Sequence, residues 1–242
     1  IIHESDMTPG LANKLCIPSA VKVCCNFPET LKYLPADKAV LTGSPIRADL
    51  LKGDRLSGLN YAHLSSEKPI LMVIGGSLGS VAVNQAVRGI LPRLLETFQI
   101  IHICGKGNLD EGLIGTPGYV QYEYVDAPLK HLFAAADVVI SRAGANSICE
   151  LLALKKPNLL IPLPASASRG DQILNAASFA KQGFSRVLEE EQITPDSLFE
   201  AITQLYARRR DYIEAMEKSS LNNAVETIFS LIEDCLPKTD KI

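Results

Sequence analysis

Short apolar runs alternate with amphipathic stretches from residue 69 onward. The first run, ILMVI at Ile70–Ile74, is wholly apolar and ends at glycines, which is typical of a strand buried on both faces. Strands are expected at 70–74, 100–104, 119–125, 138–141, 158–162 and 185–188, and helices at 81–95, 129–136, 147–154 and 172–182. This alternation predicts a doubly wound α/β domain with a parallel sheet.

The segments on either side follow other patterns. A helix is expected at 11–15, with short strands at 20–25 and 39–42, and these pieces do not complete a domain. Residues 51–68 are polar and contain glycines, so we expect a surface connection there. Apolar residues at helical spacing predict helices at 196–207, 209–219 and 221–236. The chain opens at Ile1–Glu4 like the end of a buried strand, and we expect the start of a longer protein to be missing.

Composition narrows the class of protein. Hydrophobic residues make up 47% and charged residues 21% of the 242 positions, a globular balance. The net charge of -3 gives no overall positive field, so nucleic acid is not an expected partner. The six cysteines and four histidines lack metal-ligand spacing, which predicts buried thiols in a reducing cytoplasm, with no metal and no cofactor. No apolar run reaches the length of a membrane span.

Two loops follow predicted strands and open predicted helices. Gly75–Ser80, GGSLGS, combines glycines with a helix start, where unpaired N–H groups and a partial positive charge suit a diphosphate. A tight turn without a ligand is the alternative. The stretch Ser141–Glu150 repeats the arrangement, and Glu150 is expected one turn inside the helix. Its carboxylate could accept hydrogen bonds from ribose hydroxyls, or it could be a helix-start acid that favours the helix dipole. Because ligands of open sheets bind at the carboxyl ends of strands, the pair of loops indicates a nucleotide.

Other polar residues lie beside these loops in the predicted fold. Arg47 follows GSPI and could neutralise a diphosphate, or it could be a surface residue in a turn. Asp171 and Gln172 follow the fifth strand and either contact a ligand or belong to a polar loop. No G-x-S-x-G motif occurs, which argues against hydrolase chemistry of the nucleophile-elbow type. His102, inside an apolar strand, is expected to be a core residue.

Together these motifs resemble the MurG family of UDP-N-acetylglucosamine transferases. The resemblance rests on the segments His3–Lys14, Gly43–Arg47, Gly75–Ser80, Arg142–Glu150 and Asp171–Ala176, in order along nearly the whole chain. The H-E-x-x-x-x-P-G-L-x-N-K segment is its most specific part. The family has the GT-B fold, two Rossmann-like domains. The resemblance implies that residues 1–46 end the N-terminal acceptor domain, 47–219 form the C-terminal donor-binding domain, and 220–242 return as a helix toward the N-terminal domain.

The resemblance also implies an activity: inverting transfer of N-acetylglucosamine from UDP-N-acetylglucosamine to undecaprenyl-diphospho-muramoyl-pentapeptide (lipid I), giving lipid II in peptidoglycan synthesis. The enzyme would be cytoplasmic and peripheral on the inner face of the cell membrane. The implied donor-binding residues are Arg47, Gly76, Ser77, Leu78, Gly79, Val125, Gly144, Ala145, Asn146, Ser147, Glu150, Asp171 and Gln172. The backbone near Val125 would read the uracil, Glu150 the ribose, and Asp171 and Gln172 the sugar. His3, Glu4 and Asn13 would lie toward the acceptor.

Two departures from the family pattern matter. The family's glycine-rich loop ending in His, implicated in proton abstraction, is absent from this sequence. No catalytic base is therefore assigned, and this chain alone is expected to be inactive. Ser5-Asp6 stands where many relatives have Gln-Asn. The alternatives are a non-catalytic fragment that binds nucleotide sugars and a related diacylglycerol glycosyltransferase, which the His3–Lys14 segment disfavours.

Overall fold

The computed structural model describes residues 1–76, 79–168 and 170–236. The contacts divide the chain into two compact units. The larger unit is Arg47–Lys218, and the smaller unit joins Ile1–Ile46 to the segment that begins at Ser219. Each unit is described separately below.

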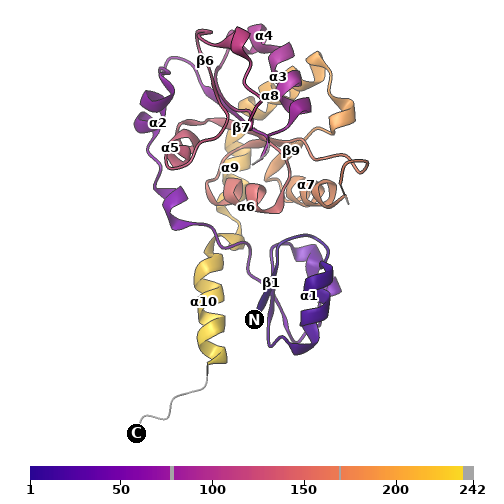
Figure 1. Ribbon diagram of the computed structural model, residues 1–242. Coiled ribbons are helices and arrows are strands. Elements are labelled where there is room, and N and C mark those ends of the chain that lie inside the picture. The colour runs from indigo at the N-terminus through magenta and orange to yellow at the C-terminus, as the bar shows by residue number, and fades with distance from the viewer. Residues whose placement is uncertain (77–78, 169, 237–242) are drawn as a thin grey trace. The chain divides into compact units, whose positions relative to one another are not determined.

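The larger unit is built on a parallel sheet whose described strands follow the order β6-β5-β4-β7-β8-β9 (Figure 1). The strands are β4 (Ile70–Ile74), β5 (Gln99–Ile103), β6 (Tyr119–Tyr122), β7 (Val138–Ser141), β8 (Asn158–Leu160) and β9 (Ser185–Val187). Their residues are largely β-branched and apolar, and β5 and β7 are buried throughout. The predicted parallel α/β domain is confirmed.

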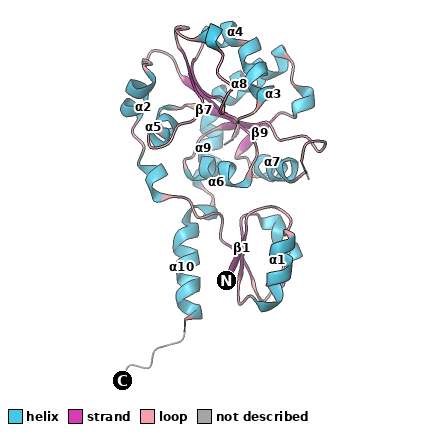
Figure 2. Cartoon of the chain, in the orientation of Figure 1, coloured by secondary structure: helices cyan, strands magenta, loops and turns pink. Residues whose placement is uncertain are grey.

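Helices cover both faces of this sheet (Figure 2). They are α2 (Arg55–Ala62), α3 (Val81–Gly89), α4 (Leu91–Leu95), α5 (Leu129–Ala135), α6 (Ala145–Ala153), α7 (Asp171–Lys181), α8 (Pro195–Ala207) and α9 (Arg209–Glu217). One core joins the apolar faces of α3, α4 and α8 to alternate residues of the strands, such as Leu71 and Val73 of β4. Burial of these side chains is the main force holding the layers together.

The expected surface connection at 51–68 is wrong, because this segment contains α2. Asp54 caps the helix by accepting a hydrogen bond from the Ser57 N–H at 2.7 Å, and His63 ends it in the left-handed conformation. Gly58 lets α2 approach α5 closely, since a Cβ there would lie 2.1 Å from the His131 carbonyl oxygen. Gly58 lowers helix propensity in the sequence but permits this packing in three dimensions.

Other element bounds differ from the predictions in smaller ways. The helix expected at 81–95 is divided at Ile90, ahead of Pro92, into α3 and α4. The helix expected at 147–154 begins two residues earlier, at Ala145. The third strand ends at Tyr122 rather than at residue 125.

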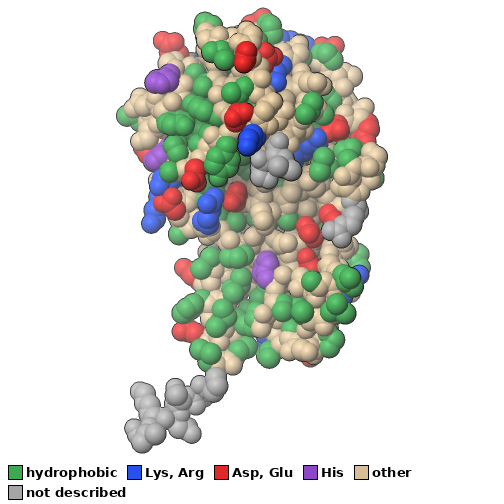
Figure 3. Space-filling model, in the orientation of Figure 1, with side chains coloured by type: hydrophobic (Ala, Val, Ile, Leu, Met, Phe, Trp, Pro, Cys, Tyr) green, Lys and Arg blue, Asp and Glu red, His purple; other side chains and the backbone are tan. Residues whose placement is uncertain are grey.

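The smaller unit contains a short parallel sheet and two described α-helices. Its strands β1 (Ile2–Glu4), β2 (Val23–Cys25) and β3 (Ala39–Leu41) pair in that order, and α1 (Leu11–Cys16) follows β1. Helix α10 (Ala224–Cys235) carries the exposed apolar side chains Val225, Phe229 and Ile232 (Figure 3). Among the described helices, none combines the length and hydrophobicity needed to cross a bilayer.

Candidate functional site

The two loops singled out in the sequence start from adjacent strands. β4 and β7 pair in parallel at the centre of the sheet, with Ile74 opposite Ser141. From β4 the sheet extends one way through β5 and β6, and from β7 the other way through β8 and β9. This is the point where the strand order reverses, and ligands of open α/β sheets bind there, beyond the carboxyl ends of the strands.

The first loop is a glycine turn that leads into α3. Gly76 and Gly79 have φ angles of 89° and 76°, and the Gly79 N–H donates to the Gly76 carbonyl at 3.1 Å. A Cβ on Gly79 would lie 2.0 Å from the Cys104 carbonyl oxygen, so only glycine fits. Ser80 caps α3 by accepting from the Val83 N–H. Ser77 and Leu78, both predicted donor contacts, lie outside the described residues.

The second loop ends in a helix start without a side-chain cap. Gly144 is the N-cap of α6, and no side chain caps it. A Cβ on Gly144 would meet nothing within 4 Å. In the described chain, the N–H groups of Ala145, Asn146 and Ser147 have no hydrogen-bond partner. Ala145 and Asn146, which lie ahead of the expected helix, join Ser147 in the first turn of α6, so the three amides point out of the helix start and favour an anion.

Glu150 occupies the last turn of α6. Its backbone carbonyl accepts from Leu154 N–H, so it lies near the C-terminal end of the helix. The interpretation of Glu150 as a helix-start acid is therefore wrong. Burial raises the pKa of the Glu150 carboxyl, and the Arg47 charge opposes that rise. No side chain or amide of the described residues donates a hydrogen bond to this half-buried carboxylate, which is therefore free to accept from a ligand.

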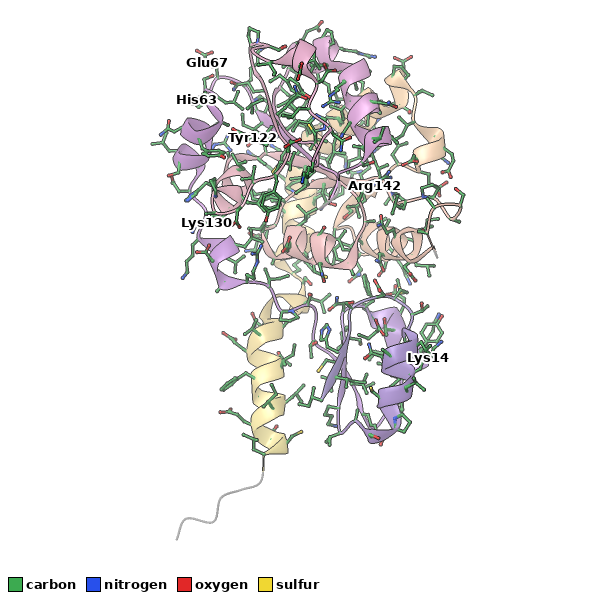
Figure 4. All side chains as sticks on the ribbon, in the orientation of Figure 1. Lys14, His63, Glu67, Tyr122, Lys130 and Arg142 are labelled. Carbon is green, nitrogen blue, oxygen red and sulfur yellow. The ribbon has the colours of Figure 1, made fainter. Side chains whose placement is uncertain are left out.

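Arg142 ties these loops together, a role that sequence reasoning missed (Figure 4). Its side chain is almost fully buried and donates to the carbonyl oxygens of Ile161 and Pro162, each at 3.1 Å. It also donates to Ser80 Oγ at 2.7 Å and pairs with the Glu190 carboxylate. One guanidinium thus links the start of α3, the end of β7 and the segment after β8. An arginine beside a glycine loop suggests an anion ligand, but here protein groups use its donors.

Gln172 and Asn175 of α7 hold the second loop. The Gln172 amide oxygen accepts from the backbone N–H groups of Ala143 at 3.2 Å and Leu163 at 3.1 Å. Asn175 donates to the Ala143 carbonyl at 3.2 Å. These bonds fix which end of the Gln172 amide is oxygen, and they leave its NH₂ group for another acceptor. Asp171 is the first residue of α7, which follows Gly170 in the left-handed conformation.

The two remaining donor-side candidates lie at the edges of this region. Val125 is buried just beyond β6, and within the described chain no hydrogen bond engages its backbone N–H or C=O. Arg47 is exposed at the start of the 3₁₀ helix Ala48–Lys52, and its charge acts on Glu150. The larger unit therefore brings Arg47, Glu150 and the α6 start into one electrostatic neighbourhood.

The predicted acceptor-side residues bind one another within the smaller unit. The buried Glu4 carboxylate accepts from Asp6 N–H, Gly10 N–H and Asn13 Nδ2, at 2.8 to 3.0 Å. Asn13 also donates to the His3 carbonyl at 3.2 Å, and the His3 ring contacts the Gly43 carbonyl oxygen at 3.0 Å. Glu4 and Asn13 therefore fix the shape of the segment between β1 and α1. Across the described ranges, no group of three or more His, Cys, Asp or Glu could hold a metal ion.

The fold defines the class as a domain of the GT-B glycosyltransferase type, built on a parallel α/β sheet. The chain shares its fold with the crystal structure of Acinetobacter baumannii MurG, with a TM-score of 0.73 at 23% identity, over 96% of this chain and 66% of that one. Residues 70–231 match the glycosyltransferase family 28 C-terminal domain, so the chain belongs to that family.

Two curated relatives have much higher sequence identity. Both are named UDP-N-acetylglucosamine--N-acetylmuramyl-(pentapeptide) pyrophosphoryl-undecaprenol N-acetylglucosamine transferase. The chain is 61% identical to the protein of Lachnospira eligens and 60% identical to that of Lachnoclostridium phytofermentans, each over 234 residues. These matches cover 97% of this chain and 66% of each relative. The chain thus spans about two-thirds of the length of these relatives.

Proposed function

We propose that this chain is the donor-binding part of an inverting transferase that moves N-acetylglucosamine from UDP-N-acetylglucosamine to lipid I. The names of the two relatives state this substrate pair, and their identity of 60% or more over nearly the whole chain supports carrying it over. The cytoplasmic location, peripheral on the inner face of the cell membrane, belongs to the same proposal.

The observation that carries the proposal is the pairing of two features on α6. Among the described residues, no group accepts from the three N–H groups that open the helix, and none donates to the half-buried Glu150 carboxylate near its end. A uridine diphosphate presents both complementary groups, an anionic diphosphate and a ribose with two neighbouring hydroxyls. In the proposal the α6 start and the glycine turn meet the diphosphate, and Glu150 accepts from the ribose.

The remaining contacts are proposed from the groups around the two loops. The backbone N–H and C=O of Val125, which have no partner among the described residues, match the acceptor and donor on the edge of uracil. The NH₂ of Gln172, which has no acceptor among the described residues, would donate to a hydroxyl of the sugar. Asp171, the residue before it, is proposed as a second contact to the sugar. Arg47 would neutralise the departing diphosphate, whose negative charge grows as the glycosidic bond breaks.

Inversion requires one direct displacement, so this part of the enzyme needs no nucleophile. Its task is to orient the donor and stabilise UDP as it leaves. We assign the base that deprotonates the acceptor hydroxyl to a part of the enzyme outside this chain. Because Glu4 and Asn13 are occupied by protein contacts, we propose that they shape an acceptor-side segment while His3 lies at its edge.

Calorimetry on the purified chain tests the donor assignment. UDP-N-acetylglucosamine and UDP should bind, and ADP should bind at least tenfold more weakly because adenine cannot reproduce the uracil contacts at Val125. Equal affinity for ADP and UDP, or no binding of either, would contradict the proposal. A lipid I analogue added to the chain with donor should give no turnover, because the base is elsewhere.

A further inference from the structure

A series of buried hydrogen bonds leads from Tyr119 through His102 and Asn84 to the Cys104 carbonyl, which lies against Gly79. Asn84, in the first turns of α3, donates from Nδ2 to the Cys104 carbonyl at 2.9 Å. That carbonyl oxygen is the atom a Cβ on Gly79 would strike. Asn84 and Cys104 are both buried, and Cys104 directly follows β5, the neighbour of β4. The position of Gly79 is thus set against a carbonyl that Asn84 holds.

Each group in this series of hydrogen bonds donates to the next one, in the direction of the Cys104 carbonyl. Because the Asn84 NH₂ donates to Cys104, its oxygen faces the His102 ring, 2.9 Å from Nε2. His102 must therefore carry its proton on Nε2, and Nδ1 accepts from the Tyr119 hydroxyl at 2.8 Å. Burial and the nearby Arg88 charge lower the pKa of His102 to about 3, so the ring stays neutral. Burial raises the pKa of Tyr119 to about 12, so its hydroxyl keeps its proton.

We propose that Asn84, oriented by His102, is a positioning residue for Gly79 and sets where the start of α3 meets the donor diphosphate. This rests on the proposed function of the larger unit. Without Asn84 the Cys104 carbonyl loses its donor and can rotate or shift. Gly79 then loses the surface that fixes it, and the start of α3 that follows is no longer held in place. A phosphate-directed hydrogen bond that is lost in this way costs about tenfold in affinity.

A comparison of the affinities for uridine and UDP separates positioning from general stability. In the proposed function the start of α3 meets only the diphosphate, whereas the uridine part of the ligand meets Val125 and Glu150. Asn84→Ala should therefore raise the Kd for UDP about tenfold and leave that for uridine within about twofold. A loss of folding stability alone would not change the ratio of the two affinities in the folded protein.

Asn158 provides a matched control. Like Asn84 it is 1% exposed, and it donates to two backbone carbonyls, those of Lys156 at 2.8 Å and Phe184 at 3.4 Å. It is the first residue of β8, so it lies at the amino ends of the parallel strands, whereas the glycine turn follows the carboxyl end of β4. Asn158→Ala should lower the melting temperature as Asn84→Ala does and leave both affinities unchanged. Tyr119→Phe removes only the far hydroxyl and keeps the core filled, so it serves if Asn84→Ala does not fold. Tyr119→Phe should lose less affinity for UDP than Asn84→Ala does, and its affinity for uridine should stay unchanged.

The outcomes are distinct. If wild-type protein binds neither uridine nor UDP, the proposed function fails and this inference falls with it. If wild-type binds UDP, but the folded variants keep the wild-type ratio of UDP to uridine affinity, the positioning role alone is overturned. A selective loss of UDP affinity in Asn84→Ala or Tyr119→Phe, absent from Asn158→Ala, supports it.

Discussion

Glu150→Gln should weaken the binding of UDP and stabilise the fold at the same time. The substitution keeps the size of the side chain and removes its charge. In the folded protein that charge is half buried, has no donor among the described residues and lies in the last turn of α6. Each of these conditions raises the free energy of the ionised carboxylate unless a bound ligand donates hydrogen bonds to it.

The two magnitudes can be estimated separately. A hydrogen bond to a charged acceptor exceeds a neutral one by about 1 kcal/mol, so two ribose hydroxyls give about 2 kcal/mol, or roughly 30-fold in Kd. On the stability side, an anion near a helix C-terminus costs about 0.3–1 kcal/mol, and its burial adds to that. A gain of about 1 kcal/mol corresponds to a rise of about 2–4 °C in Tm for a protein of this size.

The pH dependence of the stability gain has a definite sign. Burial raises the pKa of Glu150 above its ordinary value of 4.5. The unfolded chain therefore releases this proton at a lower pH than the folded protein, and folding loses stability as pH rises through the raised pKa. Gln has no such loss. The stability advantage of Glu150→Gln should be present at pH 7 and should vanish by about pH 4.

Calorimetry and thermal melts on the same samples provide the assay, with UDP and its 2′-deoxy analogue as ligands. Wild-type should prefer UDP, and Glu150→Gln should lose most of that preference. Glu200→Gln is the control, because Glu200 is the sixth residue of α8 as Glu150 is of α6, but it is exposed and accepts from Gln204 at 2.6 Å. The reasoning is refuted if Glu150→Gln lowers Tm, or if its UDP affinity matches wild-type.

Three further predictions concern acid stability, helix packing and metal independence. The pKa of His102 is about 3 in the folded protein and ordinarily 6.5, so the unfolding free energy should fall as pH drops below 6.5, by up to about 1.4 kcal/mol per pH unit. Urea titrations at several pH values measure this dependence, and in His102→Leu the unfolding free energy should change less with pH. Gly58→Ala should destabilise by several kcal/mol because its Cβ would lie 2.1 Å from a backbone oxygen. Gly89→Ala, at the end of α3 with nothing within 4 Å, should be neutral or stabilise by up to about 1 kcal/mol, as thermal melts can check. UDP-N-acetylglucosamine should bind equally with and without EDTA, and abolition of binding by the chelator would contradict the charge balance assigned to Arg47 and the helix amides.

The sequence predicts the centre of this fold better than its periphery. The bounds of β4 and β7, Ile70–Ile74 and Val138–Ser141, agree with the prediction because strands buried on both faces tolerate only apolar residues and end at small ones. α2 could not be found in this way. Its apolar pattern is weak, and the helix depends on Gly58 meeting α5, a contact between segments about 70 residues apart.

The site shows the same division. The two loops and their helix starts follow from local patterns of glycine and small residues after a strand. The partners of Arg142 could not be predicted, since Glu190 and the carbonyls of Ile161 and Pro162 come from later segments. Likewise, the sequence could not show that the backbone of Val125 and the NH₂ group of Gln172 have no partner among the described residues, because that depends on every other hydrogen bond around them.

The strand order has a consequence for how the larger unit folds. β4 comes first in this sheet yet occupies its centre, and it must pair with β7, which begins 64 residues after β4 ends. All described pairings are parallel, so no two neighbouring strands can form first as a local hairpin. The half made of β4, β5 and β6 is complete in the nascent chain before β7 is synthesised, leaving an apolar strand edge open. Folding should therefore be slow for its size and sensitive to aggregation until β7 adds to that edge.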